Sequence, residues 1–401
     1  MPRAALYLTF ASAVAVLFGI AVSQVLLALA LVALLLSGEP LRLPPIWKPL
    51  AVFLGLTLVS LAFSPDPAAG LPQVRKIYVY TMLLAAFSTL RGLDWIRRLF
   101  LAWAAAGALV AARGLVQYGE KAAEAASLGR GFYEFYMPER ITGFMSHWMT
   151  FGGQLMFALL MLAAMLVFSG GLRGRWIWIL CFAAMAAGIV LGWTRSIWLA
   201  TAVAGLYLAW FWRRWLVALA PVILLLGVFA APEPVRTRAV SILQPKKEVD
   251  SNEHRVVTWR TGIEMIKANP WTGLGPEQVG VQFERYVPRD IPWPLPTGWY
   301  GHLHNIYLHY AAERGIPAML ALVWLLVQML VDFARALRRL PPGPGEARWI
   351  LHGAIAVVIA TMIAGVFELN LGDSEVLTMF LVVASCGYVA VDASRQEPSG
   401  A

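Results

Sequence analysis

The sequence has little with which to build a soluble fold or a metal site. Only 14% of its 401 residues are charged, whereas 59% are hydrophobic. The two cysteines, Cys181 and Cys386, both lie within apolar runs, which supports neither a disulfide framework nor a thiolate metal site. Asp-x-Asp, a pattern of paired carboxylates, occurs nowhere in the chain. This composition excludes an ordinary soluble domain.

Long apolar runs take up most of the chain instead. A hydrocarbon core about 30 Å thick needs about 20 mainly apolar residues per helix. We therefore expect an all-α polytopic integral membrane protein, with Arg3 before a retained first span because no small-residue cleavage site follows. The predicted spans are 4–20, 21–37, 48–63, 74–90, 98–117, 149–168, 176–192, 196–210, 216–231, 315–334, 349–367 and 375–391.

Positive charge divides the short connections between these spans into two sets. One set contains Arg42, Arg97, Arg173, Arg213 and Arg338, so the positive-inside rule makes these loops and both termini cytoplasmic. The opposite set then lies outside the cytoplasm. It comprises the loops 64–73, 118–148, 193–195, 232–314 and 368–374.

The chain therefore divides into three predicted regions. Residues 1–231 hold nine membrane spans, and residues 232–314 form one long extracytoplasmic loop with amphipathic helices and a site of His and Arg side chains. Residues 315–401 hold the last three spans and a cytoplasmic C-terminus. About twelve transmembrane helices result.

Arginine outnumbers lysine on the predicted outer face. A guanidinium group is a planar fork that suits phosphate oxygens, so this bias indicates an anionic ligand outside the membrane. Contact with lipid headgroups is the alternative. Arg195 is the clearest case, because two spans meet at Thr194-Arg195-Ser196 with almost no loop between them. A charge placed there needs a partner or a ligand, unless it snorkels to the interface.

The long loop contains signals for a helix. Asp250-Ser251-Asn252-Glu253 offers capping side chains, and Val256, Trp259, Ile263 and Ile266 recur at helical spacing until Asn269-Pro270 ends the run. Arg255 and Trp259 share a face, whereas Arg260 projects elsewhere. Arg255 is thus the better candidate for a buried site.

Two further stretches of the loop carry possible binding residues. Pro270 to Pro276 is a turn whose glycines could present backbone N–H groups to an anion, although a plain turn is the simpler interpretation. Pro288 to Tyr300 carries four prolines, with Trp299 and Tyr300 at its end. Those aromatic rings could stack on sugars or anchor the loop at the membrane interface.

A cluster of histidines closes the loop. Three of the six histidines, His302, His304 and His309, lie within eight positions. Asn305 is placed to cap a short helix that ends at Gly315, which puts His304 at the positive end of the helix dipole and favours a neutral base. His302 and His304 could instead form a His-x-His zinc pair or a structural cluster, but no third ligand is evident. His309 could pair with Glu313 on the same helix face.

These residues together resemble a known family. The resemblance rests on Thr194-Arg195-Ser196, Arg255 with Trp259, Pro270 to Gly275, His302 to Leu308 and Glu313 to Ile316, with Arg140 to Gly143 as a weaker element. In combination they are similar to the O-antigen ligase and polymerase family of bacterial membrane glycosyltransferases. The similarity covers roughly residues 140–320, and one long outer loop among about twelve spans looks most like the ligase branch. It implies a GT-C-like fold of the kind found in lipid-linked sugar transferases.

The resemblance also implies a reaction and its residues. Ligases of this family transfer polysaccharide from undecaprenyl diphosphate to the lipid A-core oligosaccharide without a metal, nucleotide or other cofactor. The essential Arg matches Arg195, the loop Arg matches Arg255 or Arg260, and the essential His matches His304 or His302. We hypothesise that Arg195 and Arg255, assisted by Arg140 and Arg260, neutralise the diphosphate. His304 would take the acceptor proton in an inverting transfer.

Other functions are compatible with the same pattern. An O-antigen polymerase would join one donor repeat to another, and a protein ligase would use a pilin Ser or Thr as acceptor. From another class, a transporter of an anionic lipid-linked glycan would need charges along a path at mid-membrane depth. The expected setting is the bacterial inner membrane, with the active site on the periplasmic side. The expected partners are the donor, the acceptor and membrane lipids, but no nucleic acid, and the sequence leaves the oligomeric state open.

Overall fold

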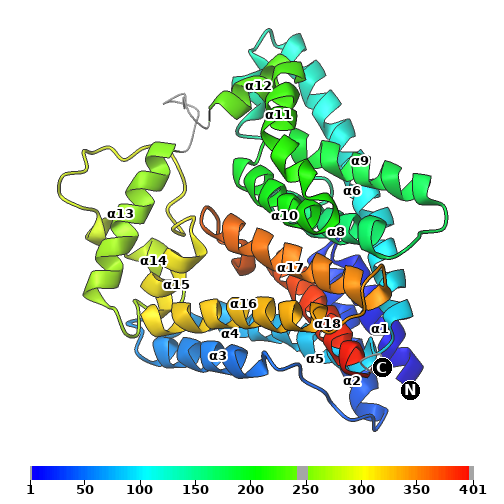
Figure 1. Ribbon diagram of the computed structural model, residues 1–401. Coiled ribbons are helices and arrows are strands. Elements are labelled where there is room, and N and C mark those ends of the chain that lie inside the picture. The colour runs from blue at the N-terminus through cyan, green and yellow to red at the C-terminus, as the bar shows by residue number, and fades with distance from the viewer. Residues whose placement is uncertain (1, 242–251, 397–401) are drawn as a thin grey trace.

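The described chain is built of helices, with an extended connection from Val287 to Asn305 (Figure 1). In the computed structural model, the described residues are 2–241 and 252–396. The first part of the chain forms α1 (Pro2–Ala15), α2 (Ile20–Leu36), α3 (Trp47–Ala62), α4 (Leu71–Arg75), α5 (Ile77–Thr89), α6 (Leu93–Ser127), α7 (Phe132–Tyr136), α8 (Trp148–Phe168), α9 (Arg175–Leu191), α10 (Arg195–Arg213) and α11 (Trp215–Ala230). The remainder forms α12 (Glu233–Val240), α13 (Asn252–Ala268), α14 (Gln278–Val281), η1 (Phe283–Tyr286), α15 (Ile306–Arg314), α16 (Ile316–Leu337), α17 (Glu346–Gly365), η2 (Asn370–Gly372) and α18 (Ser374–Gln396).

The prediction of an all-helical polytopic membrane protein is confirmed. In the described part of the chain α6, α8, α16, α17 and α18 are long and apolar enough to cross a bilayer, and shorter apolar helices accompany them. Each of the twelve predicted spans contains a helix. The number of helices that cross the membrane stays a prediction, because several of them are shorter than the bilayer requires without tilt or thinning.

Two predicted boundaries are wrong. The first span ends at Ala15 rather than at residue 20, and two serines then fasten α1 to α2: the Ser12 hydroxyl donates to the Ser23 carbonyl over 2.7 Å, and the Ser23 hydroxyl donates back over 2.9 Å. The fifth predicted span continues to Ser127 instead of ending at 117. Its added turns are rich in Ala, Glu and Lys, which are strong helix formers.

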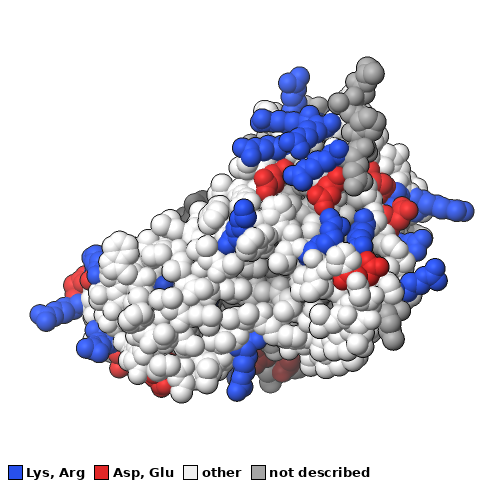
Figure 2. Space-filling model, turned by 90° about the horizontal axis from the view of Figure 1, so that it is seen from below, with Lys and Arg blue, Asp and Glu red and all other residues white. Residues whose placement is uncertain are grey.

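The membrane helices pack around α8, α17 and α18. α8 lies against α6, α9, α10 and α17, and α18 lies against α5, α16 and α17. Figure 1 shows α13, α14 and α15 together at one side of the molecule, whereas α1 begins and α18 ends at the opposite side. Figure 2 shows a face that is largely uncharged, with Lys and Arg gathered toward its margins. This distribution suits contact with lipid.

The predicted loop forms a small core of its own. Its buried apolar residues are Val257, Met265, Leu274, Val279, Phe283, Ile291, Leu303 and Ala312. The helix from Asn252 to Ala268 ends where predicted, but its proposed cap at Asp250 and Ser251 lies outside the described residues. Two of the apolar residues that recur at helical spacing, Val256 and Ile263, do not join this core, because they are 57% and 42% exposed.

The buried face of α13 is defined by small residues instead. It is formed by His254, Val257, Thr258, Thr261, Gly262 and Met265. A Cβ atom at Gly262 would lie 2.5 Å from Leu303 Cδ1, so glycine is what lets the loop carrying the histidines pack closely against α13. The spacing of bulky apolar residues therefore did not indicate which face of α13 is buried.

The turn from Pro270 to Pro276 is a packing element. Gly273 and Gly275 have φ values of +69° and +104°, and the N–H groups of Leu274 and Gly275 donate to the carbonyls of Ala312 and Glu313 over 2.9 Å each. A Cβ atom at Gly273 would lie 2.3 Å from the backbone carbon of Glu313. The turn thus packs against the end of α15, which agrees with its interpretation as a plain turn rather than an anion site.

The start of α15 is fastened to the end of α17. The Tyr307 hydroxyl donates to the carbonyl of Met362 over 2.9 Å. A Cβ atom at Gly365 would lie 2.7 Å from Ile306 Cγ2, so the missing side chain makes room for the isoleucine. This contact fixes the segment before α15 beside the segment after α17, and the site lies there.

Candidate active site

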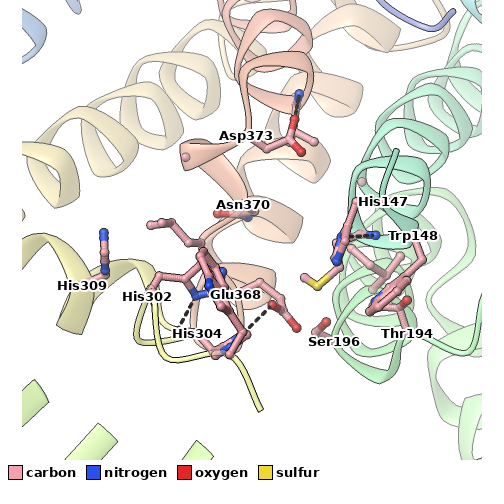
Figure 3. Close-up of a pocket in the computed structure, with 18 of the residues that line it drawn as sticks. His147, Trp148, Thr194, Ser196, His302, His304, His309, Glu368, Asn370 and Asp373 are labelled. Carbon is pink, nitrogen blue, oxygen red and sulfur yellow. Dashed lines mark hydrogen bonds and ion pairs between the residues drawn. The ribbon is translucent and has the colours of Figure 1, made fainter. Parts of the chain in front are cut away.

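A cavity of about 890 Å³ lies between the loop core and the membrane helices. Its walls come from α4, the segment before α8, the starts of α10 and α13, α12, the segment before α15, and the segment between α17 and α18. Figure 3 shows His304 and Glu368 facing one another, with Asn370 and Asp373 above them and His147 and Trp148 across the cavity. Segments far apart in the sequence therefore share one site.

Five of the six histidines line this cavity. They are His147, His254, His302, His304 and His309. The ring of His304 lies between two of the others, with centroids 4.1 Å from His302 and 5.2 Å from His254. Within residues 2–241 and 252–396, no group of three or more His, Cys, Asp or Glu side chains could hold a metal ion.

The backbone around His304 is set by its neighbours. His304 has a φ of +47°, a left-handed conformation that is uncommon for residues other than glycine. Its N–H donates to Nδ1 of His302 over 3.2 Å, which supports this turn. The predicted cap is confirmed, since the Asn305 side chain accepts from the N–H groups of Tyr307 and Leu308. The helix it caps, α15, ends at Arg314 with Gly315 at a φ of +86°.

Glu368 links a histidine to an arginine. Its Oε1 accepts from Arg255 Nη2 over 2.8 Å, and its Oε2 lies 3.5 Å from His304 Nδ1. The Glu368 side chain is only 3% exposed. Among the described residues, Nε2 of His304 has no hydrogen-bond partner. The imidazole thus faces a carboxylate with one nitrogen, whereas its other nitrogen is buried without a partner in that part of the chain.

Burial keeps the flanking histidines neutral. Desolvation, together with the nearby His304, lowers the pKa of His254 to about 4. The same two causes, with His309 as a further one, lower the pKa of His302 to about 2. Because both rings remain uncharged near neutral pH, they offer lone pairs but no positive charge beside His304.

Arginines gather on the opposite wall, around the tight turn between α9 and α10. Trp193 has a φ of +50° there, is fully buried, and packs against Phe132, Tyr133 and Tyr136. Its carbonyl accepts from Arg238 Nε over 3.0 Å and from Arg140 Nη1 over 3.4 Å. The guanidinium of Arg140 also lies 4.3 Å from the ring centroid of Trp148.

These arginines are close enough for the positive charge of one to disfavour the charged form of another. Desolvation, and then the charge of Arg238, lowers the pKa of Arg140 to about 9. Arg195, at the first position of α10, donates to the Ser241 carbonyl over 2.8 Å and to Asn252 Oδ1 over 2.6 Å. Positive charge held together at a helix N-terminus is the arrangement that an anion stabilises.

The structure brings most, but not all, of the predicted residues together. The cavity is lined by Arg140, Arg195, Arg255, Trp299, His302 and His304. Arg260 lies outside the lining of this cavity, where it is exposed and paired with Asp290 over 2.8 Å.

Two predicted aromatic residues also lie outside the lining. Trp259 packs against Phe367, with ring centroids 6.3 Å apart. Tyr300 packs between His254 and Phe283, and its hydroxyl donates to the Pro296 carbonyl over 2.6 Å. Both support the cavity wall from behind. Trp299, by contrast, is 65% exposed at the cavity and lies edge-on to His302.

Sequence reasoning missed several residues of the site, of which Glu368, His147 and Asp373 are the main ones. All three lie in loops that were predicted to be on the same side of the membrane as the histidine cluster. That predicted topology was the signal in the sequence that could have identified them. The predicted pair of His309 and Glu313 is confirmed at 3.5 Å, and Glu313 also accepts from Arg314 Nε over 2.9 Å.

Comparison with known families bears on this cavity. Residues 180–323 match the family model described as O-antigen ligase, and this range contains Arg195, Arg255, His302 and His304. Residues 180–323 are an O-antigen ligase domain. The match begins at residue 180 and not near 140, so Arg140 lies before the O-antigen ligase domain and Glu368 lies after it. A comparison with curated proteins finds no match.

The O-antigen ligase domain supplies part of the cavity lining, on both the histidine and the arginine walls. The segment before α8, with Arg140 and His147, and the segment after α17, with Glu368, complete it from outside the matched range. A family of this kind acts on lipid-linked glycans, which fits a membrane protein whose cavity gathers cations at one wall and a histidine at the other.

Proposed function

We propose that the protein is an O-antigen ligase, a metal-independent inverting glycosyltransferase of lipopolysaccharide biosynthesis. It would transfer polysaccharide from undecaprenyl diphosphate to the lipid A-core oligosaccharide at the periplasmic side of the bacterial inner membrane. One observation carries the proposal: an imidazole with an unpartnered Nε2 shares a cavity with a wall of arginines, and most of these residues belong to a domain of this family.

The arginines would bind the diphosphate of the donor. Arg140, Arg195, Arg238 and Arg255 reach the cavity from four separate segments, so they could surround two phosphate groups from different sides. Guanidinium groups form bidentate hydrogen bonds with phosphate oxygens and keep their charge in a partly buried site. They would stabilise the negative charge that develops on the leaving diphosphate, which is the largest electrostatic requirement of the transfer.

His304, rather than His302, would be the general base. Nδ1 of His302 already accepts the N–H of His304, and burial lowers the pKa of His302 to about 2. His304 has a carboxylate at Nδ1 and an unpartnered Nε2. A base needs a lone pair within reach of the proton it removes, and a group that stabilises the cation it becomes.

The reaction balances with these groups alone. The acceptor hydroxyl gives its proton to His304 Nε2, and its oxygen attacks the anomeric carbon from the face opposite the diphosphate. The bond between that carbon and the diphosphate oxygen breaks, and the electron pair leaves with the lipid diphosphate. A single displacement of this kind inverts the anomeric configuration. Trp299, exposed at the cavity, would stack on a sugar ring of the acceptor or donor.

Reconstitution with defined substrates tests this function. Purified protein in liposomes would be given a lipid-linked glycan donor, with or without lipid A-core. The proposal expects glycan on lipid A-core and no lengthening of the donor when the acceptor is left out. Longer lipid-linked chains from donor alone would identify a polymerase instead, and glycan found only on an added pilin peptide would identify a protein ligase.

A further inference from the structure

Glu368 is a buried charge that lies outside the O-antigen ligase domain and has no part in the displacement itself. Its segment follows α17, and the contact between Gly365 and Ile306 helps to hold it beside the histidine cluster. The Tyr307 hydroxyl, bound to the Met362 carbonyl, fixes the same register. These two contacts thus hold the segment that carries His304 beside the segment that carries Glu368.

We propose that Glu368 is a positioning residue that sets the tautomer of His304 and couples it to Arg255. An ionised carboxylate only accepts hydrogen bonds, so Oε2 facing Nδ1 favours the proton on Nδ1. Nε2 is then left with a free lone pair. This inference rests on the proposed role of His304 as the base.

The carboxylate of Glu368 would also stabilise His304 after that imidazole has become positively charged. When His304 takes the acceptor proton on Nε2, Nδ1 keeps its own proton and Glu368 remains a carboxylate beside the new imidazolium. Oε1 meanwhile holds Arg255 at 2.8 Å, on the side where the diphosphate would bind. The 3.5 Å between Oε2 and Nδ1 is long for a hydrogen bond, and such contacts shorten when substrate fills a catalytic site.

The flanking rings leave His304 as the only member of its cluster that faces this carboxylate. His302 and His254 lie on either side of it and are kept neutral by burial, and Arg255 is engaged by the other oxygen of Glu368. In the described chain, Oε2 of Glu368 has no hydrogen-bond partner and lies close to Nδ1 of His304. A buried oxygen in this state is expected to find a donor when substrate is bound.

Nitrogen-15 NMR of the imidazoles tests the tautomer directly. The protein has six histidines, so the difference between spectra of the wild type and His304→Ala identifies the signals of His304. We expect a protonated Nδ1 and an unprotonated Nε2 in the wild type. Glu368→Gln should lose this preference, because an amide can donate to Nδ1 as readily as it accepts from it.

Kinetics of the same variants show whether the tautomer matters. Glu368→Gln should lower kcat by about a hundred-fold or more, while the KM for donor changes little because Gln still offers an oxygen to Arg255. Glu368→Asp keeps the charge and should recover part of the loss. Glu277→Gln is a matched control, since it removes a carboxylate from the cavity near the far end of α15, where the N–H of Glu277 donates to Glu313. It should leave the His304 signals unchanged.

Three results would overturn the inference. They are a wild-type His304 protonated at Nε2, unchanged His304 signals and kcat in Glu368→Gln, or the same change of signals in Glu277→Gln. The role of His304 as the base fails by a different result, which is transfer that persists in His304→Ala, and the ligase function fails if reconstitution lengthens the donor in the absence of lipid A-core. These failures are distinguishable because the spectrum reports the tautomer whether or not the protein catalyses transfer.

Discussion

His302 and His304 are one residue apart, yet the structure predicts that substitutions at the two positions differ in effect by orders of magnitude. In the proposed mechanism His304 takes the proton, whereas His302 only accepts the N–H of His304 through Nδ1. Asparagine places its Oδ1 the same number of bonds from the backbone as histidine places Nδ1. His302→Asn can therefore keep that hydrogen bond, and His302→Ala cannot.

The expected magnitudes follow from these roles. A hydrogen bond of this type contributes about 0.5–1.5 kcal/mol, so His302→Ala should slow transfer by about two- to thirteen-fold. His302→Asn should remain closer to the wild type than His302→Ala. Loss of a general base lowers rates by about 10²–10⁴, so His304→Ala should fall by that factor.

The assay is the initial rate of glycan transfer to lipid A-core in liposomes, with donor binding measured separately by filtration. Donor binding should survive in all three variants, because the arginine wall is unchanged. If His302→Asn lost as much activity as His304→Ala while still binding donor, the assignment of the base would be refuted. Full activity in His304→Ala would refute it equally.

Further substitutions test other parts of the site. Arg195→Lys keeps the charge but loses the planar fork, so kcat/KM should fall by about ten-fold or more, whereas Arg260→Lys, at an exposed pair with Asp290, should be near neutral. Glu313→Gln leaves Arg314 buried without its carboxylate, which should cost about 3–5 kcal/mol and lower the melting temperature followed by tryptophan fluorescence. Burial lowers the pKa of His254 from 6.5 to about 4, so between those values the unfolded chain binds more protons and stability should fall with falling pH. His254→Gln should flatten that slope in melting curves, and an unchanged slope would contradict the reasoning.

Local signals predicted much of this structure well. The Asn305 cap, the Gly315 end of α15 and the pair of His309 with Glu313 each depend on residues a few positions apart. The preference for Arg255 over Arg260 came from helical geometry alone, and of the two it is Arg255 that lines the cavity. Such features need only the geometry of one helix.

Contacts between segments far apart in the sequence could not be predicted in the same way. Glu368 reaches His304 because Gly365 admits Ile306, and nothing near residue 368 in the sequence indicates that contact. The apolar spacing of α13 did not reveal its buried face for a related reason, since Gly262, which has no side chain, is what packs closely against Leu303. How closely two segments pack depends on the side chains of both, and the apolar periodicity of one helix gives no information about its partner.

The central claim is a single displacement in this cavity, driven by arginines and a histidine base. The most direct test is the anomeric configuration of the new linkage, measured by NMR on product formed by purified protein, donor and lipid A-core in the presence of a chelator. The account predicts that product forms and that its configuration is inverted relative to the donor. Retained configuration, or no product until a divalent metal is restored, would contradict it.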